Sequence, residues 1–136
     1  MIHHRHWQGR TVAAQSARAA RGAMGNAAGR AAEDIVARQY EARGATVIAR
    51  RWRGKSGEID LILRHGDQHI FVEVKKSRDH ATAVARITAS QITRIFRAAE
   101  EFCAGLVTGL NSDMRFDAAT VDSFGQVEIL EGALCQ

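Results

Sequence analysis

Two acidic residues and a lysine between residues 57 and 75 have the spacing of a metal site. Two runs rich in Ile, Leu, Val and Phe flank Gly66-Asp67, and this pattern predicts a hairpin with a tight turn. Partners across such a hairpin have residue numbers with a constant sum, so Asp60 is expected opposite Glu73. Lys75 follows Glu73 by two residues and is expected on the same face, opposite Glu58.

Facing carboxylates need a compensating charge, because side chains on neighbouring strands lie roughly 5 Å apart and like charges there repel. A divalent cation would supply that charge. Mg²⁺ favours one or two carboxylates together with water and phosphate oxygens, and the backbone carbonyl of Val74 is a further candidate ligand. The alternative is an exposed sheet face whose charges are merely solvated. The metal site is favoured because the other face of the hairpin is expected to be uniformly apolar, with Ile59, Leu61, Leu63, Ile70, Val72 and Val74.

Length and composition indicate one soluble domain. The 136 residues are 46% hydrophobic and 25% charged, which suits a globular protein with a core of its own. No run approaches the roughly 20 apolar residues of a membrane span, and the first eight residues lack the apolar core of a secretory signal, so we expect a cytoplasmic protein without membrane association. Cys103 and Cys135 are isolated and are expected to be reduced thiols without a metal role.

The basic charge is unevenly distributed. Five arginines and no acidic residue fall within residues 1–30, although the formal net charge of the whole chain is only +4. We interpret residues 1–27 as a basic arm that is disordered or partly helical, and residues 28–136 as a single domain. The arm either contacts nucleic-acid phosphates or is a solvated tail. Its histidines, His3, His4 and His6, are expected to bind metal adventitiously at most.

Periodicity predicts a helix from Gly29 to Gly44, a strand over 46–52, the hairpin, a polar segment over 76–85 and a second helix capped by Thr88 and Gln91. Strands over 114–121 and 126–130 complete the chain. The crossover through the second helix makes the fourth strand parallel to the third. The expected fold is therefore α/β, a mixed sheet flanked by helices in the order α-β-β-β-α-β-β. Glu33 lies on the first helix where it can approach the charged hairpin face.

A basic segment with an aromatic residue lies at the end of the first predicted strand and in the loop that follows it. Arg51, Trp52, Arg53 and Lys55 suit contacts to phosphates and stacking on bases. The alternative places the ring of Trp52 in the core at the end of a strand.

Four blocks in this order resemble the PD-(D/E)XK nuclease superfamily, with its restriction-endonuclease-like fold, and among its members the Holliday-junction resolvases. More narrowly, they look like the YraN-like family of uncharacterised bacterial proteins, over about residues 28–131. The blocks are Gly29-Arg-Ala-Ala-Glu33, Gly57-Glu-Ile-Asp-Leu-Ile62, Phe71-Val-Glu-Val-Lys75 and Arg115-Phe-Asp117.

The resemblance implies that Asp60 and Glu73 bind Mg²⁺ or Mn²⁺, that Glu33 completes the acidic cluster, and that Lys75 orients the attacking water and stabilises negative charge. Glu58 is expected to position Lys75. Two residues depart from the family pattern: Gln91 stands where a lysine is common, and Arg51 stands where asparagine usually precedes Trp-Arg. Loss of the lysine would weaken phosphate binding at the second helix.

Two functions follow from these observations. The first is a metal-dependent endonuclease-like phosphodiesterase acting on DNA, in particular branched or structured DNA. The second is a nucleic-acid-binding module that retains the acidic site without cleaving. Intact Asp60, Glu73 and Lys75 favour the first, whereas Gln91 and a near-neutral domain favour the second. The sequence leaves open DNA or RNA as the nucleic acid, and a monomer or a homodimer as the assembly.

Overall fold

A computed structural model describes residues 28–135 of the chain, and the predicted basic arm of residues 1–27 lies outside them. From Ala32 onward the chain forms one compact unit. A helix over residues 28–42 precedes the strands β1 (Thr46–Arg53), β2 (Glu58–His65) and β3 (Gln68–Lys76). The helices α2 (His80–Ala85) and α3 (Ala89–Ala104), a single helical turn at Gly109–Asn111, and the strands β4 (Asp113–Val121) and β5 (Val127–Leu130) follow.

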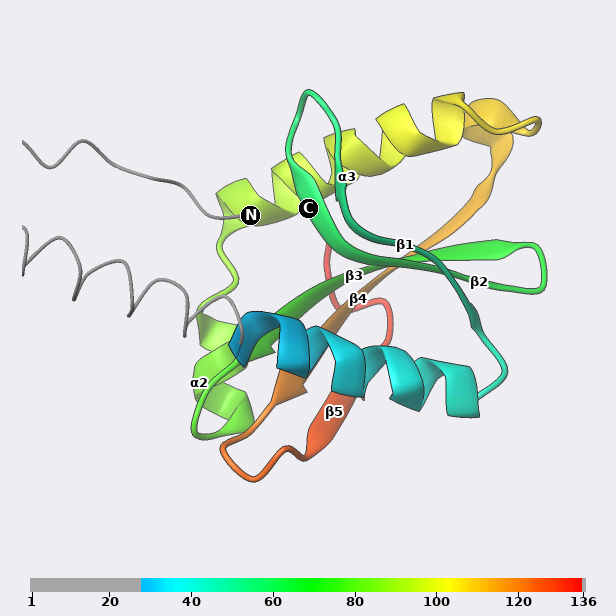
Figure 1. Cartoon of the computed structure of the whole chain (residues 1–136). Helices are drawn as coiled ribbons and strands as arrows, with labels where there is room; N and C mark the ends of the chain where they lie inside the picture. The colour runs from blue at the N-terminus through cyan, green and yellow to red at the C-terminus, as the bar shows by residue number, and fades with distance from the viewer. Residues whose placement is uncertain (1–27, 136) are drawn as a thin grey trace, which may run out of the picture. The chain divides into compact units, whose positions relative to one another are not determined.

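The described strands form one mixed sheet in the order β1-β2-β3-β4-β5. β3 and β4 run parallel, while the other neighbouring pairs are antiparallel. The parallel pair confirms the crossover that the sequence predicts, because a parallel return needs a long connection, which α2 and α3 provide. The predicted α/β fold, a mixed sheet flanked by helices, is confirmed (Figure 1).

The helix over residues 28–42 covers one face of the sheet. It ends before Gly44, whose φ of +93° is a left-handed conformation that glycine adopts without steric cost. Its buried residues, among them Val36 and Tyr40, share a core with buried residues of β2, β3 and β4: Leu61, Leu63, Ile70, Val72, Ala119 and Val121. Period-two alternation in the strands and 3.6-residue periodicity in the helix therefore meet in one apolar layer.

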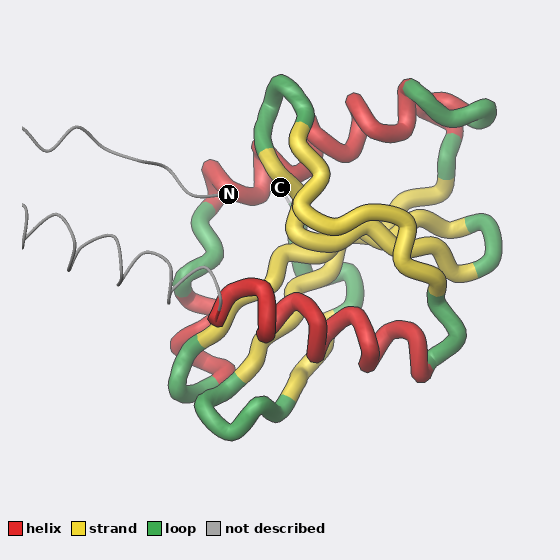
Figure 2. Tube along the Cα trace, in the orientation of Figure 1, coloured by secondary structure: helices red, strands yellow, loops and turns green. Residues whose placement is uncertain are grey.

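α3 covers the opposite face, so the strands lie between two helices (Figures 1 and 2). The predicted capping box is present: the Thr88 side chain accepts from the Gln91 N–H, and the Gln91 side chain accepts from the Thr88 N–H. Ala98, Ala99 and Cys103 pack on Ile59, Ile62 and Phe71 of the hairpin. The middle of the hairpin is thus buried on both faces, which corrects the expectation that only one of its faces is apolar.

The segment after β3 is more ordered than the sequence predicts. Residues 80–85 form α2, where we expected a polar segment without structure. The helix begins because Asp79 caps it: its carboxylate accepts from the Thr82 N–H at 2.8 Å. Ala83 is fully buried. The single buried residue explains why no apolar stripe marks this helix in the sequence.

Candidate functional site

The hairpin of β2 and β3 separates at the point where its acidic residues begin. The predicted register is confirmed from Arg64↔His69 to Leu61↔Val72, but the paired ladder ends there. The constant-sum rule predicted that Asp60 and Glu73 are backbone partners, but the ladder ends one residue before them. Instead the Asp60 carboxylate accepts the N–H of Val74 at 2.8 Å, so a side chain replaces the next rung of the ladder.

The side chains of Asp60 and Glu73 nevertheless meet. Burial raises the pKa of Asp60 well above its ordinary value, and the charge of Glu73 and a hydrogen bond with it raise that pKa further. The Val74 N–H acts in the opposite direction, and the charge of Glu33 adds a smaller increase. Glu73 is only 8% exposed. Two acids in contact with little solvent between them form a site that favours either a retained proton or a bound cation.

Lys75 lies on the same side as Glu73, with its Nζ 3.2 Å from the Glu73 Oε2. The expected partner of Lys75, Glu58, is engaged elsewhere: its carboxylate binds the Arg53 guanidinium at 3.1 Å. The prediction that Glu58 positions Lys75 across the hairpin is therefore wrong. The reason is that β2 and β3 are no longer paired beyond Leu61 and Val72, so Glu58 and Lys75 do not face each other.

Glu33 enters the same acidic group from the helix over residues 28–42. Its carboxylate accepts from the Arg51 Nε at 2.8 Å, and the Glu33 and Arg51 side chains are only 11% and 22% exposed. The hydrogen bond to Glu33 raises the pKa of Arg51, burial lowers it, and the charges of Glu58 and Asp60 add to the increase. The neighbouring Arg50 pairs with Asp34. Arg51, expected to contact nucleic acid, is thus held by an acid of the site.

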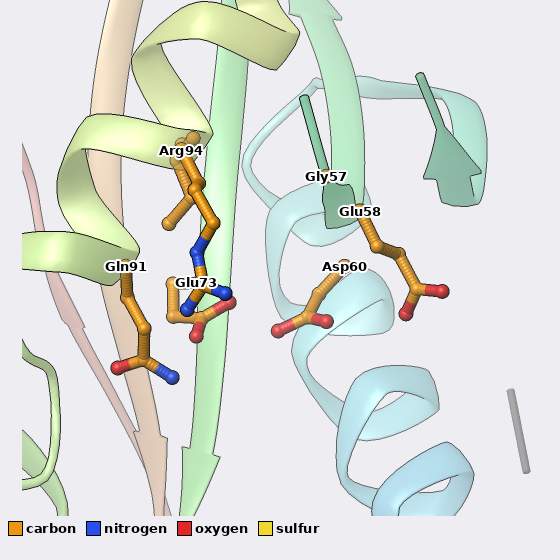
Figure 3. Close-up of a pocket in the computed structure, with 7 residues that line it drawn as sticks. Gly57, Glu58, Asp60, Glu73, Gln91 and Arg94 are labelled. Atoms are coloured by element: carbon orange, nitrogen blue, oxygen red, sulfur yellow. The ribbon is translucent and has the colours of Figure 1, made fainter. Parts of the chain in front are cut away.

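A pocket of about 220 Å³ opens beside the acidic pair. β2 and its preceding turn contribute Gly57, Glu58 and Asp60, β3 contributes Glu73, and α3 contributes Gln91, Arg94 and Ile95. Figure 3 shows Gln91 and Arg94 extending from α3 toward the pocket, while Glu58 is directed away from Glu73. Lys75 is not among the lining residues. The pocket is therefore lined by three carboxylates, of which Asp60 and Glu73 meet, together with one arginine and one amide.

Sequence reasoning missed Arg94. It lies one helical turn after Gln91, and the spacing of three was the signal that both residues share a face. Gly57 lines the same pocket, and a methyl group added at Gly57 would lie 3.5 Å from the Cβ of Arg94, an ordinary van der Waals distance. Arg94 is exposed and forms no ion pair with any residue in the range 28–135. Its charge is therefore available to a ligand.

The other residues expected to contact nucleic acid divide between core and surface. The Trp52 ring packs edge-on against Phe102, with centroids 5.5 Å apart, so the core interpretation of this residue is the one the structure supports. Lys55 and Arg53 are exposed. The loop that carries Lys55 is fixed to α3, because the Glu101 carboxylate accepts the N–H groups of Lys55 and Ser56 at 2.9 and 2.7 Å. These hydrogen bonds lower the pKa of Glu101.

Asp117, from the last of the four sequence blocks, supports the fold at a distance from the pocket. It is fully buried and accepts hydrogen bonds from the Tyr40 hydroxyl at 2.7 Å, from the Gly132 N–H at 2.9 Å and from Arg115. Burial and this carboxylate both raise the pKa of Tyr40 above its ordinary value. The network ties the helix over residues 28–42 to β4 and to the segment after β5.

The donor set at Asp60 and Glu73 fits a hydrated divalent cation. Carboxylate oxygens are the ligands that Mg²⁺ and Mn²⁺ prefer, and Mg²⁺ commonly takes only one or two of them, with water at its other positions. Within residues 28–135, no group of three acidic, histidine or cysteine side chains is arranged to enclose an ion. The pair thus suits an ion that retains much of its water, as a phosphate-binding ion does.

Relatives of the chain are numerous among bacterial proteins. The model of "Uncharacterised protein family UPF0102" matches residues 32–121. A UPF0102 protein of Cereibacter sphaeroides is 56% identical over 106 residues, which cover 78% of this chain and 91% of the relative. One from Ruegeria pomeroyi is 51% identical over 115 residues (85% and 94%), and one from Roseobacter denitrificans is 50% identical over 121 residues (89% and 94%).

None of the described helices is long and apolar enough to cross a membrane.

The family match spans Glu33, both strands of the hairpin, α3 and Asp117, and so includes every element that surrounds the pocket. The expected YraN-like relationship is therefore confirmed. The chain belongs to the UPF0102 family, which is part of the restriction-endonuclease-like superfamily.

Proposed function

We propose that the protein is a metal-dependent nuclease that hydrolyses phosphodiester bonds in DNA. The observation that carries this proposal is the meeting of Asp60 and Glu73 beside a pocket that also contains an unpaired arginine. Two carboxylates in contact are unfavourable without a cation. An arginine that no described acid neutralises is suited to an anionic ligand beside that cation.

In this proposal Asp60 and Glu73 hold Mg²⁺ or Mn²⁺. A bound ion would supply Lewis-acid chemistry, which polarises a phosphoryl oxygen and makes water a stronger nucleophile at neutral pH. Asp60 is already oriented for this role, because its second oxygen is fixed by the Val74 N–H. The hydrogen bond sets the direction of the carboxylate before an ion arrives, which lowers the cost of ordering the site.

Lys75 has the proposed role of orienting the attacking water and stabilising negative charge. Its ammonium group is 3.2 Å from Glu73, so it is held within reach of the site by a proposed metal ligand. The pairing also makes its position dependent on the ionised state of Glu73. A lysine in this position places a positive charge where charge develops during hydrolysis, which is the kind of interaction that accelerates the chemical step.

Arg94 is the proposed phosphate-binding residue on α3. Gln91 stands on this helix where the family commonly has a lysine, but Arg94 places a cation at the same pocket one turn later. A guanidinium can donate two parallel hydrogen bonds to phosphate, which a lysine cannot. Gln91 retains an amide that can donate to a phosphate oxygen. Arg94 and Gln91 thus support binding of a phosphate group. The proposed substrate includes branched DNA.

The experiment is a cleavage assay on a panel of linear, flapped and four-way DNAs with Mg²⁺ or Mn²⁺. The parent chain is compared with Asp60→Asn and with Asp67→Asn, a matched control in the exposed turn of the same hairpin. We expect cleavage by the parent and by Asp67→Asn, and none by Asp60→Asn. A matching RNA panel tests the choice of nucleic acid.

Two outcomes contradict the proposal. Equal cleavage by the parent and by Asp60→Asn would show that a contaminating nuclease or another site is responsible. Absence of cleavage on every DNA, together with binding that still depends on Asp60, would instead support the nucleic-acid-binding module with a retained acidic metal site. Binding is measured in Ca²⁺ by fluorescence anisotropy with the same DNAs.

A further inference from the structure

Arg51 has a backbone conformation that is unusual for its residue type. Among the described residues it is the one non-glycine residue with a positive φ, at +50°. The left-handed region is unfavourable for side chains that carry a Cβ, and it persists where surrounding interactions require it. The interaction here is the 2.8 Å hydrogen bond between the Arg51 Nε and the Glu33 carboxylate.

The left-handed residue changes the direction of side chains along β1. Successive residues of a strand normally point to opposite faces, yet Arg50 and Arg51 both bind acids of the helix over residues 28–42, Asp34 and Glu33. Beyond this point Trp52 packs on the side of the sheet that Ala49 occupies. The irregular backbone therefore serves to present two consecutive arginines to one helix.

The same reversal occurs on the neighbouring strand. Arg50 pairs with Leu61 and Trp52 pairs with Ile59, so Arg51 lies opposite Asp60. Ile59 shares a core cluster with Ile62, three residues later, where strict alternation would separate them. Our expectation that Ile59 lies on the same face as Leu61 is therefore wrong. The face changes at Arg51 and Asp60 together, which places the guanidinium within the acidic group.

The charges around Arg51 show what it neutralises. Glu33 is its direct partner, and Glu58 and Asp60 attract the same guanidinium more weakly. Glu33 is the acid that would be needed, with Asp60 and Glu73, to hold a second divalent ion. The Glu33 carboxylate is already bonded to the Arg51 guanidinium, whose side chain is only 22% exposed. Glu33 is therefore a poor metal ligand, because binding an ion would leave Arg51 with no direct partner.

We propose that Arg51 takes the place of a second metal ion and restricts the site to one divalent cation, held by Asp60 and Glu73. The inference rests on the proposed metal-dependent function and specifies its stoichiometry. Guanidinium remains protonated throughout the accessible pH range, so this substitute charge is permanent. Glu33 then acts through Arg51, by keeping the guanidinium beside Asp60, and does not bind the ion itself.

The test is Mn²⁺ stoichiometry by isothermal titration calorimetry on the full chain. A variant with both Asp60→Asn and Glu73→Gln measures ions bound outside the site, including at the N-terminal histidines, and this background is subtracted. We expect one Mn²⁺ ion for the parent and for Arg51→Lys, which keeps the charge. For Arg51→Asn we expect two, because asparagine tolerates a positive φ while releasing Glu33. Adding Glu33→Gln to Arg51→Asn should return the number to one.

Each other result bears on a different claim. Two ions in the parent, or one unchanged ion in a folded Arg51→Asn variant, would overturn the inference and leave the proposed nuclease intact. No ion in the parent would overturn the metal-dependent function, and this inference with it. If Arg51→Asn fails to fold, as judged by its circular dichroism spectrum, the parent and the Arg51→Lys variant still decide the question, because a count of two in either contradicts the proposal.

Discussion

Replacing Asp60 by asparagine should stabilise the metal-free protein and remove its response to metal. The substitution keeps the shape of the side chain, and the asparagine carbonyl can still accept the Val74 N–H that Asp60 accepts at 2.8 Å. Its amide group can also donate to Glu73, which Asp60 can do only by retaining a proton. A repulsive pair thus becomes a hydrogen-bonded pair, with the rest of the site unchanged.

The magnitude follows from the contact between Asp60 and Glu73. Two unit charges about 4 Å apart repel by about 4 kcal/mol at an effective dielectric constant of about 20. The protein relieves part of this repulsion by proton uptake, since the pKa of Asp60 is raised by burial and by Glu73. We therefore expect Asp60→Asn to increase the free energy of unfolding by roughly 1–3 kcal/mol at neutral pH in EDTA.

The measurement is urea and thermal unfolding in EDTA and in Mn²⁺, with Asp67→Asn as the control for loss of an exposed acid. An ion present at about 100 times its dissociation constant stabilises the parent by about 2.7 kcal/mol, and we expect no such gain for Asp60→Asn. Lower stability of Asp60→Asn in EDTA would refute the reasoning about repulsion. Equal metal-induced shifts in the parent and the variant would refute the assignment of Asp60 as a ligand.

Four further predictions concern separate parts of the chain. Tyr40→Phe should lower the free energy of unfolding by about 2 kcal/mol in urea titrations, because it removes a charge-assisted hydrogen bond to buried Asp117; a change below about 0.5 kcal/mol would contradict this. Lys75→Ala should reduce cleavage by about 10²–10³-fold while DNA affinity, measured by anisotropy, stays nearly unchanged. Glu101 should titrate at a lower pH than ordinary glutamates in carbon-detected NMR, so its stabilising contribution is lost as the pH falls through that lowered pKa. Deleting the arm of residues 1–27 should weaken binding to all DNA sequences alike and reduce the slope of log K against log salt by about 0.9 per lost phosphate contact; an unchanged slope would identify a solvated tail.

The sequence was sufficient to predict the strands, the two longer helices and their order, but not the short helix α2. Gly66-Asp67 between apolar runs predicted the hairpin, Thr88 and Gln91 predicted the start of α3, and the long connection between β3 and β4 predicted a parallel pair. These features depend on residues close together in the chain, whose backbone preferences act locally. The sequence also indicated that Asp60, Glu73 and Lys75 share one side of the hairpin, because the period of a strand fixes which side chains are neighbours.

Only the tertiary structure decided how the charges of the site are distributed. Asp60 bonds to the backbone of Val74, Glu33 bonds to Arg51, and Arg94 of α3 lines the pocket with Gly57 and Glu73. Each of these contacts joins separate elements, and each depends on where strands separate or a backbone turns left-handed. Strand periodicity assumes a regular ladder, so it placed Glu58 opposite Lys75 and Ile59 beside Leu61, where the structure has neither. The acidic residues could be read from the sequence, but their partners are set by the departure of β1 and β2 from regular geometry at Arg51 and Asp60.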